Sequence, residues 1–170
     1  MDALSHLDAL APAEARAEFR RCCGSARWVE RMTAARPFLE RERLFAIAED
    51  TWNQLDPEDW REAFAHHPKI GDKEALRARF ADTRQWALGE QAGAAQASEE
   101  VLEALAQGNQ AYEARFGHIF IVCATGKTAA EMLALLRERL GNDPEAELRI
   151  AAREQARITR LRLEKLLAPS

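Results

Sequence analysis

The sequence predicts an all-α fold. Helix-capping residues precede several amphipathic segments, and apolar side chains recur at helical rather than alternating spacing. Paired strand segments joined by hairpin turns do not occur, and neither does a repeat of 20 to 50 residues. The chain has 170 residues, of which 47% are hydrophobic and 31% charged, which is typical of a globular protein. We therefore predict a single domain over residues 1–170, a helical bundle of about eight to nine helices.

The first half of the chain contains three segments with helical signals. Residues 12–23 and 41–54 have apolar side chains at helical spacing. The third helix is expected over residues 57–65, because Asp56 is a suitable N-cap and Pro57 suits the first helical position. Acidic residues in its first turn favour it further, since they interact well with the positive end of the helix dipole.

The second half of the chain also contains helical signals. Four more helices are predicted: a short one over residues 74–80 after Asp72, a long one that opens at Ser98, one over residues 129–140, and a last one over residues 144–167. Thr128 and Glu131 have the spacing of a capping box, and Gly141 lies where the helix that they begin would end.

Residues 116–124 depart from the helical pattern. The segment is apolar and β-branched, and it is too short for its spacing to distinguish a buried strand from a buried helix. We expect an irregular or extended segment in the core. Backbone N–H and C=O groups that are not paired within a helix are able to bind a ligand.

Charge and composition exclude several classes of function. The net charge of −4 argues against binding to a nucleic-acid backbone. No run approaches the ~20 apolar residues of a membrane span, and the first residues lack the features of a signal peptide. Three cysteines, an odd number, suit a reducing compartment. We expect the cytoplasm, because the last residues do not form the Ser-Lys-Leu signal of peroxisomal proteins.

Two familiar kinds of site are not supported. Residues 125–128 read Thr-Gly-Lys-Thr, but a phosphate-binding loop also needs a glycine at position 121, which is Ile121. His66 and His67 are adjacent, and no Cys-x-x-Cys or His-Glu-x-x-His pattern occurs, so a zinc site is not expected. We predict neither a metal site nor a phosphate-binding loop.

The most informative stretch for chemistry is the run from Phe64 to Asp72. It places His67 at the end of a helix, immediately before Pro68 and close to the turn that Gly71 allows. Histidine transfers protons near neutral pH because its unperturbed pKa is about 6.5. The alternative is that this histidine only ends the helix. Downstream, Glu90 and Gln91 stand among small residues and offer an acid/base partner, although a carboxylate on a helix is more often solvated.

Three blocks of sequence resemble one enzyme family. They are residues 67–72 (His-Pro-Lys-Ile-Gly-Asp), 90–93 (Glu-Gln-Ala-Gly) and 109–117 (Asn-Gln-Ala-Tyr-Glu-Ala-Arg-Phe-Gly). Together they resemble the OHCU decarboxylases, the 2-oxo-4-hydroxy-4-carboxy-5-ureidoimidazoline decarboxylases of urate degradation, in a likeness that extends from about Trp52 to Leu167. The resemblance implies an all-α, cofactor-free and usually dimeric enzyme that forms (S)-allantoin and carbon dioxide.

The resemblance also implies which residues form the site. By this similarity His67 is the catalytic proton donor and Glu90 the carboxylate that binds substrate N–H groups and helps to align His67. Substrate binding is expected at the following positions: Pro68, Ala87, Leu88, Gly89, Gln91, His118, Ile119, Phe120, Ile121 and Val122. Two of these depart from the family pattern, because Ala87 replaces a frequent serine and His118 a frequent phenylalanine. His118 is expected at the pocket wall, although it could instead replace the lost polarity.

Two arginines are candidate partners of an anion, since a guanidinium binds planar anions through two hydrogen bonds. They are Arg162 and Arg115, and solvated surface arginines are the alternative. For Arg162 a hydroxyl or ring oxygen is the better target, because a tight clamp on the departing carboxylate would stabilise the ground state. Two other functions stay open from the sequence: a helical ureide-binding or interaction module without activity, and a ureide hydrolase.

Overall fold

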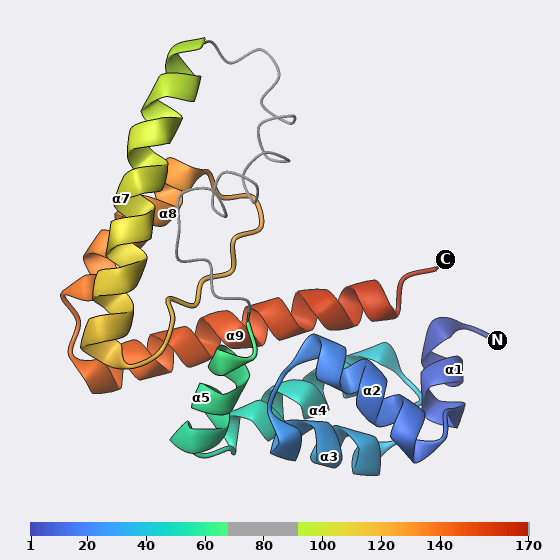
Figure 1. Ribbon diagram of the computed structural model, residues 1–170. Coiled ribbons are helices and arrows are strands. Elements are labelled where there is room, and N and C mark those ends of the chain that lie inside the picture. The colour runs from blue at the N-terminus through green and yellow to red at the C-terminus, as the bar shows by residue number, and fades with distance from the viewer. Residues whose placement is uncertain (68–91, 170) are drawn as a thin grey trace. The chain divides into compact units, whose positions relative to one another are not determined.

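The computed structural model describes residues 1–67 and 92–169, and these residues form eight helices without a strand (Figure 1). This confirms the predicted all-α class. The chain divides into two compact units. The first unit is Met1–His67 with Ala152–Ser170, and the second is Pro68–Ala151. None of the described helices is both long and apolar enough to cross a membrane.

The first unit contains five complete helices and most of a sixth. They are α1 (Ala3–Ala9), α2 (Pro12–Cys22), α3 (Ala26–Ala35), α4 (Arg41–Asn53), α5 (Pro57–Ala65) and the part of α9 (Pro144–Leu166) that follows Ala151. Its core includes Phe19, whose ring meets those of Trp28 and Phe38 edge to face at 5.9 and 6.2 Å. All three side chains are fully buried. Edge-to-face contacts of this kind add to the free energy of burial.

Local signals account for most helix boundaries of the first unit. The predicted helices over residues 12–23, 41–54 and 57–65 correspond to α2, α4 and α5 within one residue. Two short helices, α1 and α3, were not individually predicted. Each nevertheless has an N-cap side chain, since Asp2 accepts a hydrogen bond from the Ser5 amide at 2.8 Å and Ser25 accepts one from the Trp28 amide at 3.2 Å.

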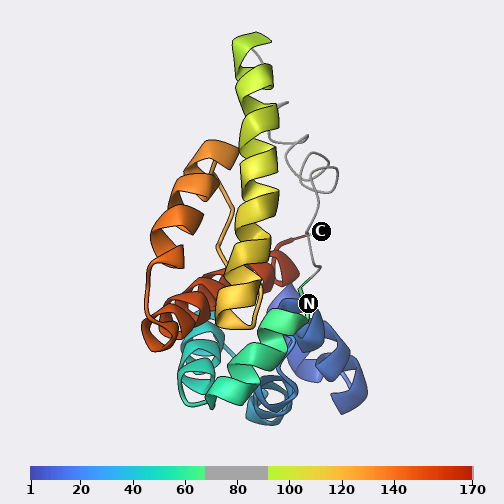
Figure 2. The same cartoon turned by 60° about the vertical axis from the view of Figure 1, so that its left-hand side comes forward.

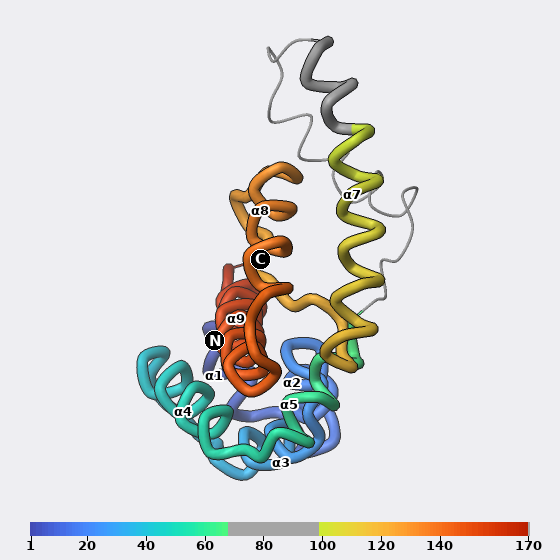
Figure 3. The backbone as a smooth tube through the Cα atoms, turned by 90° about the vertical axis from the view of Figure 1, so that its left-hand side faces the viewer, coloured from blue at the N-terminus to red at the C-terminus, as the bar shows by residue number. Residues whose placement is uncertain are grey.

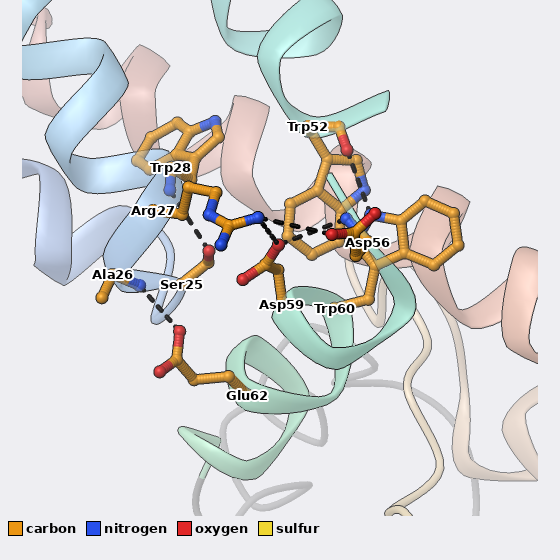
Figure 4. A network of polar contacts seen from close by, with 9 residues as sticks. All are labelled: Ser25, Ala26, Arg27, Trp28, Trp52, Asp56, Asp59, Trp60 and Glu62. Carbon is orange, nitrogen blue, oxygen red and sulfur yellow. Dashed lines mark hydrogen bonds and ion pairs between the residues drawn. The ribbon is translucent and has the colours of Figure 1, made fainter. Parts of the chain in front are cut away.

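A network of polar contacts joins α3 to α5 (Figure 4). The Ala26 amide at the start of α3 donates to the Glu62 carboxylate at 2.8 Å. Arg27 pairs with Asp56 and Asp59, at 3.4 and 3.3 Å, and these two residues form the capping box that begins α5. The contacts fix α5, and with it the direction in which the chain leaves the helix at His66.

Tryptophan side chains provide further ties between helices. The indole N–H of Trp28 donates to the Ala48 carbonyl at 3.1 Å, and that of Trp52 donates to the Ala152 carbonyl at 2.9 Å. The indole N–H of Trp60 donates to the Trp52 carbonyl at 3.0 Å. Each bond satisfies a polar group that would otherwise be costly to bury.

The second unit is built on α7 (Ala92–Phe116) and α8 (Ala129–Leu140), which pack side by side (Figure 2). Both helices run in the same direction, because residues 117–128 return along their length before α8 begins (Figure 3). A shared core joins the two helices to this return segment. Its buried members are Leu102, Leu105, Ala106, Tyr112, Val122, Met132, Leu133 and Leu136.

Residues 117–128 contain no regular secondary structure, which confirms the irregular segment predicted near 116–124. The segment leaves α7 at Gly117, whose φ of 79° favours glycine. Thr128 caps α8 as predicted, since its side chain accepts a hydrogen bond from the Glu131 amide at 3.1 Å.

The long helix begins earlier than expected. Its start was predicted at Ser98, but α7 begins at Ala92. Residues 92–97 are rich in alanine, the residue with the highest helix propensity, so the helix extends through them without needing the serine as a cap. The short helix predicted over residues 74–80 lies outside the described residues.

Candidate active site

His67 follows the last turn of α5. Its backbone N–H donates to the Phe64 carbonyl at 3.2 Å, so the end of the helix holds the residue in place. The imidazole is half-buried, and its Nε2 lies 2.5 Å from Oε1 of Gln155 in α9. The structure therefore joins the predicted proton donor to a buried amide that the sequence interpretation did not identify.

One face of α9 carries the polar groups of this site. Gln155, Thr159 and Arg162 follow one another at intervals of four and three residues, which places them on the same side of a helix. Gln155 is fully buried and donates from Nε2 to Oγ1 of Thr159 at 3.0 Å. Arg162 is half-buried and donates to the Cys22 carbonyl at 3.4 Å.

The turn between α2 and α3 lies against these groups. Its Cys22 carbonyl accepts from Arg162, and the Cys23 side chain is hydrogen-bonded to Thr159. Gly24 contacts the end of α5 closely, because a Cβ added to it would lie only 2.3 Å from the Cβ of His66. Within the first unit, the turn, the end of α5 and one face of α9 thus form a single cluster.

Both thiols of this turn are neutral at physiological pH. Burial raises the pKa of Cys22 to about 12 and that of Cys23 to about 11, and the nearby Arg162 acts in the opposite direction on both. A thiol in its protonated form is a poor nucleophile. The three cysteines of the chain are buried and form no disulfide, so the cluster is suited to proton transfer and binding rather than to thiol chemistry.

The second unit contains the segment predicted to bind substrate through residues 118–122. His118 is almost buried and its Nδ1 lies 3.0 Å from the Ile119 carbonyl. The imidazole stacks on Phe116 at 6.3 Å and meets the ring of Tyr112 edge to face at 5.5 Å. These aromatic contacts pack the imidazole against the end of α7, and the place of His118 at a pocket wall stays a prediction.

Arg139 of α8 holds the same segment. Its Nη1 donates to the Ile121 carbonyl at 2.6 Å, and its guanidinium lies 4.5 Å from the centre of the Phe120 ring. The opposite charge comes from the fully buried Glu147, which accepts from Arg139 Nε at 2.8 Å and from the Tyr112 hydroxyl. Burial, together with the hydrogen bond to Glu147, raises the pKa of Tyr112, so the phenol stays protonated as a donor.

These contacts limit which groups of residues 118–122 can bind a ligand. The Ile121 carbonyl is already bound to Arg139, and the side chains of Ile121 and Val122 are buried. Ile119 and Phe120 are partly exposed. Arg115, a candidate anion partner, donates to the Asn142 carbonyl at 2.7 Å and lies over the Phe116 ring at 5.0 Å, which gives it a structural role at the end of α7.

Six predicted site residues lie outside the described residues, namely Pro68, Ala87, Leu88, Gly89, Glu90 and Gln91. Within residues 1–67 and 92–169, no group of three or more His, Cys, Asp or Glu side chains is placed to hold a metal ion. A groove of about 440 Å³ follows α4 and α9, with Phe45, Trp52 and Arg157 among its lining residues. Thr159 of the cluster also lines this groove, whereas His67 and Arg162 do not.

The sequence alone did not indicate Gln155, Thr159 or Arg139 as site residues. Gln155 is separated from His67 by 88 positions, and Arg139 from Ile121 by 18. A signal was nevertheless present, because an amide and a hydroxyl four residues apart lie on a face of the last helix that also includes Ala152 and Leu163. Buried polar groups of this kind require partners, and the partners here belong to the site.

Comparison with models of protein families shows to which family the chain belongs. The family model for OHCU decarboxylase matches residues 8–164 of this chain. The chain belongs to the OHCU decarboxylase family. The match includes the cluster around His67 in the first unit and the segment held by Arg139 in the second.

Two similar proteins support the assignment. The uric acid degradation bifunctional protein TTL of Arabidopsis thaliana is 42% identical over 152 residues, which are 89% of this chain and 47% of that protein. The 2-oxo-4-hydroxy-4-carboxy-5-ureidoimidazoline decarboxylase of Amia calva is 41% identical over 59 residues, 35% of this chain and 34% of that protein. The chain thus spans less than half the length of these relatives.

A solved structure agrees with the fold. A crystal structure of an OHCU decarboxylase in the presence of (S)-allantoin has a TM-score of 0.71 to this chain at 38% identity, covering 89% of this chain and 98% of the other. This likeness supports the all-α fold observed here.

Proposed function

We propose that this protein catalyses the decarboxylation of 2-oxo-4-hydroxy-4-carboxy-5-ureidoimidazoline to (S)-allantoin and carbon dioxide. Membership of the OHCU decarboxylase family, over residues 8–164, is the observation that carries the proposal. The geometry around His67 supports it, because a half-buried imidazole aligned by a buried amide is suited to proton transfer.

The substrate itself explains why no cofactor is required. The carbon that bears the hydroxyl and the carboxylate is bonded to the carbon of a ring C=N group. When the carboxylate leaves as carbon dioxide, its bonding electrons form a C=C bond and the imine electrons move to the ring nitrogen, which takes a proton. Other decarboxylases use pyridoxal phosphate or thiamine for this electron sink.

The remaining step is a proton transfer to carbon. The enol hydroxyl loses its proton as its C=O bond forms, and the neighbouring carbon takes a proton on one face, which sets the configuration of (S)-allantoin. Overall the substrate carboxylate loses carbon dioxide and one proton is taken up. In the proposed mechanism His67 gives the proton to carbon and Glu90 holds the ureido or ring N–H groups.

The other predicted residues have supporting roles. Pro68, Ala87, Leu88, Gly89 and Gln91 are proposed to line the substrate site, together with the exposed parts of residues 118–122. Arg162 is proposed to bind a hydroxyl or ring oxygen of the substrate, which is consistent with a half-buried guanidinium at the edge of the cluster around His67. A homodimer stays a prediction from the family resemblance, and the cytoplasm and the single domain stay predictions from the sequence.

The deciding experiment follows circular dichroism while freshly generated substrate decays, with and without the protein. Spontaneous decay gives racemic allantoin, whereas directed protonation gives one enantiomer. We expect faster decay and a growing chiral signal, with turnover lowered by about 10²- to 10⁴-fold in His67→Asn and Glu90→Gln. His6→Asn is the matched control, because His6 is an exposed histidine of α1 and should leave turnover unchanged.

Two results would refute the proposal. Binding of a substrate analogue without faster decay would identify a ureide-binding module, and release of ammonia or urea would identify a hydrolase. Unchanged turnover in both His67→Asn and Glu90→Gln would remove the proposed roles of these two residues while leaving the activity in place.

A further inference from the structure

A row of polar groups leads from the His67 ring into the interior of the first unit. Gln155, which has no exposed surface, lies between the two ends of this row. Its Oε1 is 2.5 Å from Nε2 of His67, and its Nε2 is 3.0 Å from Oγ1 of Thr159. The two ends of an amide differ chemically, since the oxygen only accepts hydrogen bonds and the nitrogen only donates them.

The contact with Thr159 fixes which end of the amide faces the histidine. Nε2 of Gln155 donates to Oγ1 of Thr159 at 3.0 Å, one turn further along α9. The carbonyl oxygen of Gln155 is the other end of the amide, and it faces Nε2 of His67.

An oxygen that only accepts needs a donor opposite it, so Nε2 of His67 carries a hydrogen. This requirement is the same for the neutral ring and for the imidazolium. We propose that Gln155, held by Thr159, is a positioning residue that keeps Nε2 of His67 protonated and makes Nδ1 the nitrogen that transfers the catalytic proton. The inference rests on the proposed function only in assigning a catalytic use to that proton.

A neutral partner suits this task better than a charged one. A carboxylate beside an imidazole favours the imidazolium and raises its pKa, whereas an amide fixes the ring without adding charge. A general acid works best when its pKa lies near the operating pH. The charged and titratable groups around the cluster in the first unit include His66, Cys22, Cys23, Glu18, Arg21, Glu62 and Arg162.

Nuclear magnetic resonance of the imidazole nitrogens tests the inference without any substrate. In ¹⁵N-labelled protein, the His67 signals are assigned by comparison with His67→Asn. We expect a hydrogen-bonded N–H signal on Nε2 throughout a pH titration and a change of protonation only at Nδ1. In Gln155→Leu, which removes the acceptor, the persistent N–H signal should be lost through exchange with water.

A matched control separates this effect from a general loss of buried polar contacts. Thr33→Val removes a buried hydroxyl that donates to the Val29 carbonyl at 2.8 Å within α3, and it should leave the His67 signals unchanged. Thr159→Val should weaken the persistent signal, because Gln155 loses the group that holds its amide. A hydrogen found on Nδ1 with titration at Nε2, or unchanged His67 signals in Gln155→Leu, would overturn the inference.

Kinetics provides the second readout. In Gln155→Glu the alkaline limb of the kcat profile should move to higher pH by about one unit or more, with KM changing less than kcat. Far-UV circular dichroism checks that Gln155→Glu is folded. If it is not folded, the His67 resonance signals of Thr159→Val provide the test instead. An alkaline limb at its wild-type position in folded Gln155→Glu would count against the coupling. If the wild-type protein does not accelerate decay, the proposed function fails while the resonance result stands independently.

Discussion

Gly24→Ala is the most direct test of how the turn between α2 and α3 positions His67. The added Cβ would lie 2.3 Å from the Cβ of His66 and 2.5 Å from its Cγ. No side-chain rotation relieves the first of these contacts, because a Cβ is fixed to its own backbone. Ordinary contact distances begin at 3.4 Å, so either the turn or the end of α5 has to move by about 1.1 Å.

The expected cost follows from this displacement. Overpacking of a well-packed interior costs about 1–3 kcal/mol, which in a protein of this size corresponds to a lower Tm by roughly 2–4 °C per kcal/mol. His67 is joined to His66 in the same final turn of α5 and should move with it. A misplacement of about 1 Å lowers catalytic rates by up to about 10²-fold, so kcat should fall by about 10- to 100-fold.

Two other glycines provide controls. Gly108→Ala would bring a Cβ to 2.5 Å from Cδ2 of Leu136 in the second unit, which is overpacking without contact to His66. Gly141→Ala would find only the Glu138 carbonyl oxygen, at the ordinary distance of 3.7 Å. We expect lower stability but nearly normal kcat in the first control, and neither effect in the second.

The assay combines thermal unfolding with circular dichroism of substrate decay. A folded Gly24→Ala variant with wild-type kcat would refute the idea that the turn positions His67. A loss of kcat in Gly108→Ala equal to that in Gly24→Ala would refute it as well, because overpacking in general would then account for the result.

Three further predictions concern stability. Arg139→Met should lower the free energy of unfolding by about 3–5 kcal/mol in a urea titration, because it leaves the carboxylate of Glu147 buried without its opposite charge; a loss below about 1 kcal/mol would contradict this. The pKa of Cys22 rises from 9.0 to about 12 on folding, and that of Cys23 rises from 9.0 to about 11. Between these values the unfolded chain binds fewer protons than the folded protein. The free energy of unfolding should therefore fall as the pH rises above 9. The slope of unfolding free energy against pH should therefore be smaller in the double variant Cys22→Ala/Cys23→Ala, and an equal slope would exclude the thiols as its cause. Leu39 is 73% exposed and has a φ of 72°, a backbone conformation that favours glycine. Leu39→Gly should therefore raise the free energy of unfolding by up to about 1 kcal/mol. A loss of stability would show that the leucine side chain is needed.

The elements that the sequence predicted well are those with local causes. Asp56, Pro57 and Asp59 lie within four residues of one another and together begin α5. Thr128 begins α8 in the same way. Such signals act within one turn of a helix and can be read without knowledge of the fold. The early start of α7 was missed because alanine-rich sequence extends a helix without marking its first residue.

The parts of the site that could not be predicted depend on distant partners. His67 was identified from its position before Pro68, but its contact with Gln155 crosses 88 residues. The contact of Arg162 with the Cys22 carbonyl crosses 140 residues. Spacing along one helix places a side chain on a face, yet only the folded chain determines what lies opposite that face.

The tryptophans give the first unit an optical signal of its own. The chain has four tryptophans, and three of them, Trp28, Trp52 and Trp60, donate their indole N–H groups to backbone carbonyls in the first unit. The fourth, Trp86, belongs to the second unit, so the emission of a Trp86→Phe variant is expected to follow the opening of the first unit, whereas far-UV circular dichroism follows the helices of both. Coincident transitions by the two methods would mean that the chain unfolds as one cooperative domain, and separate transitions would mean that the units open independently.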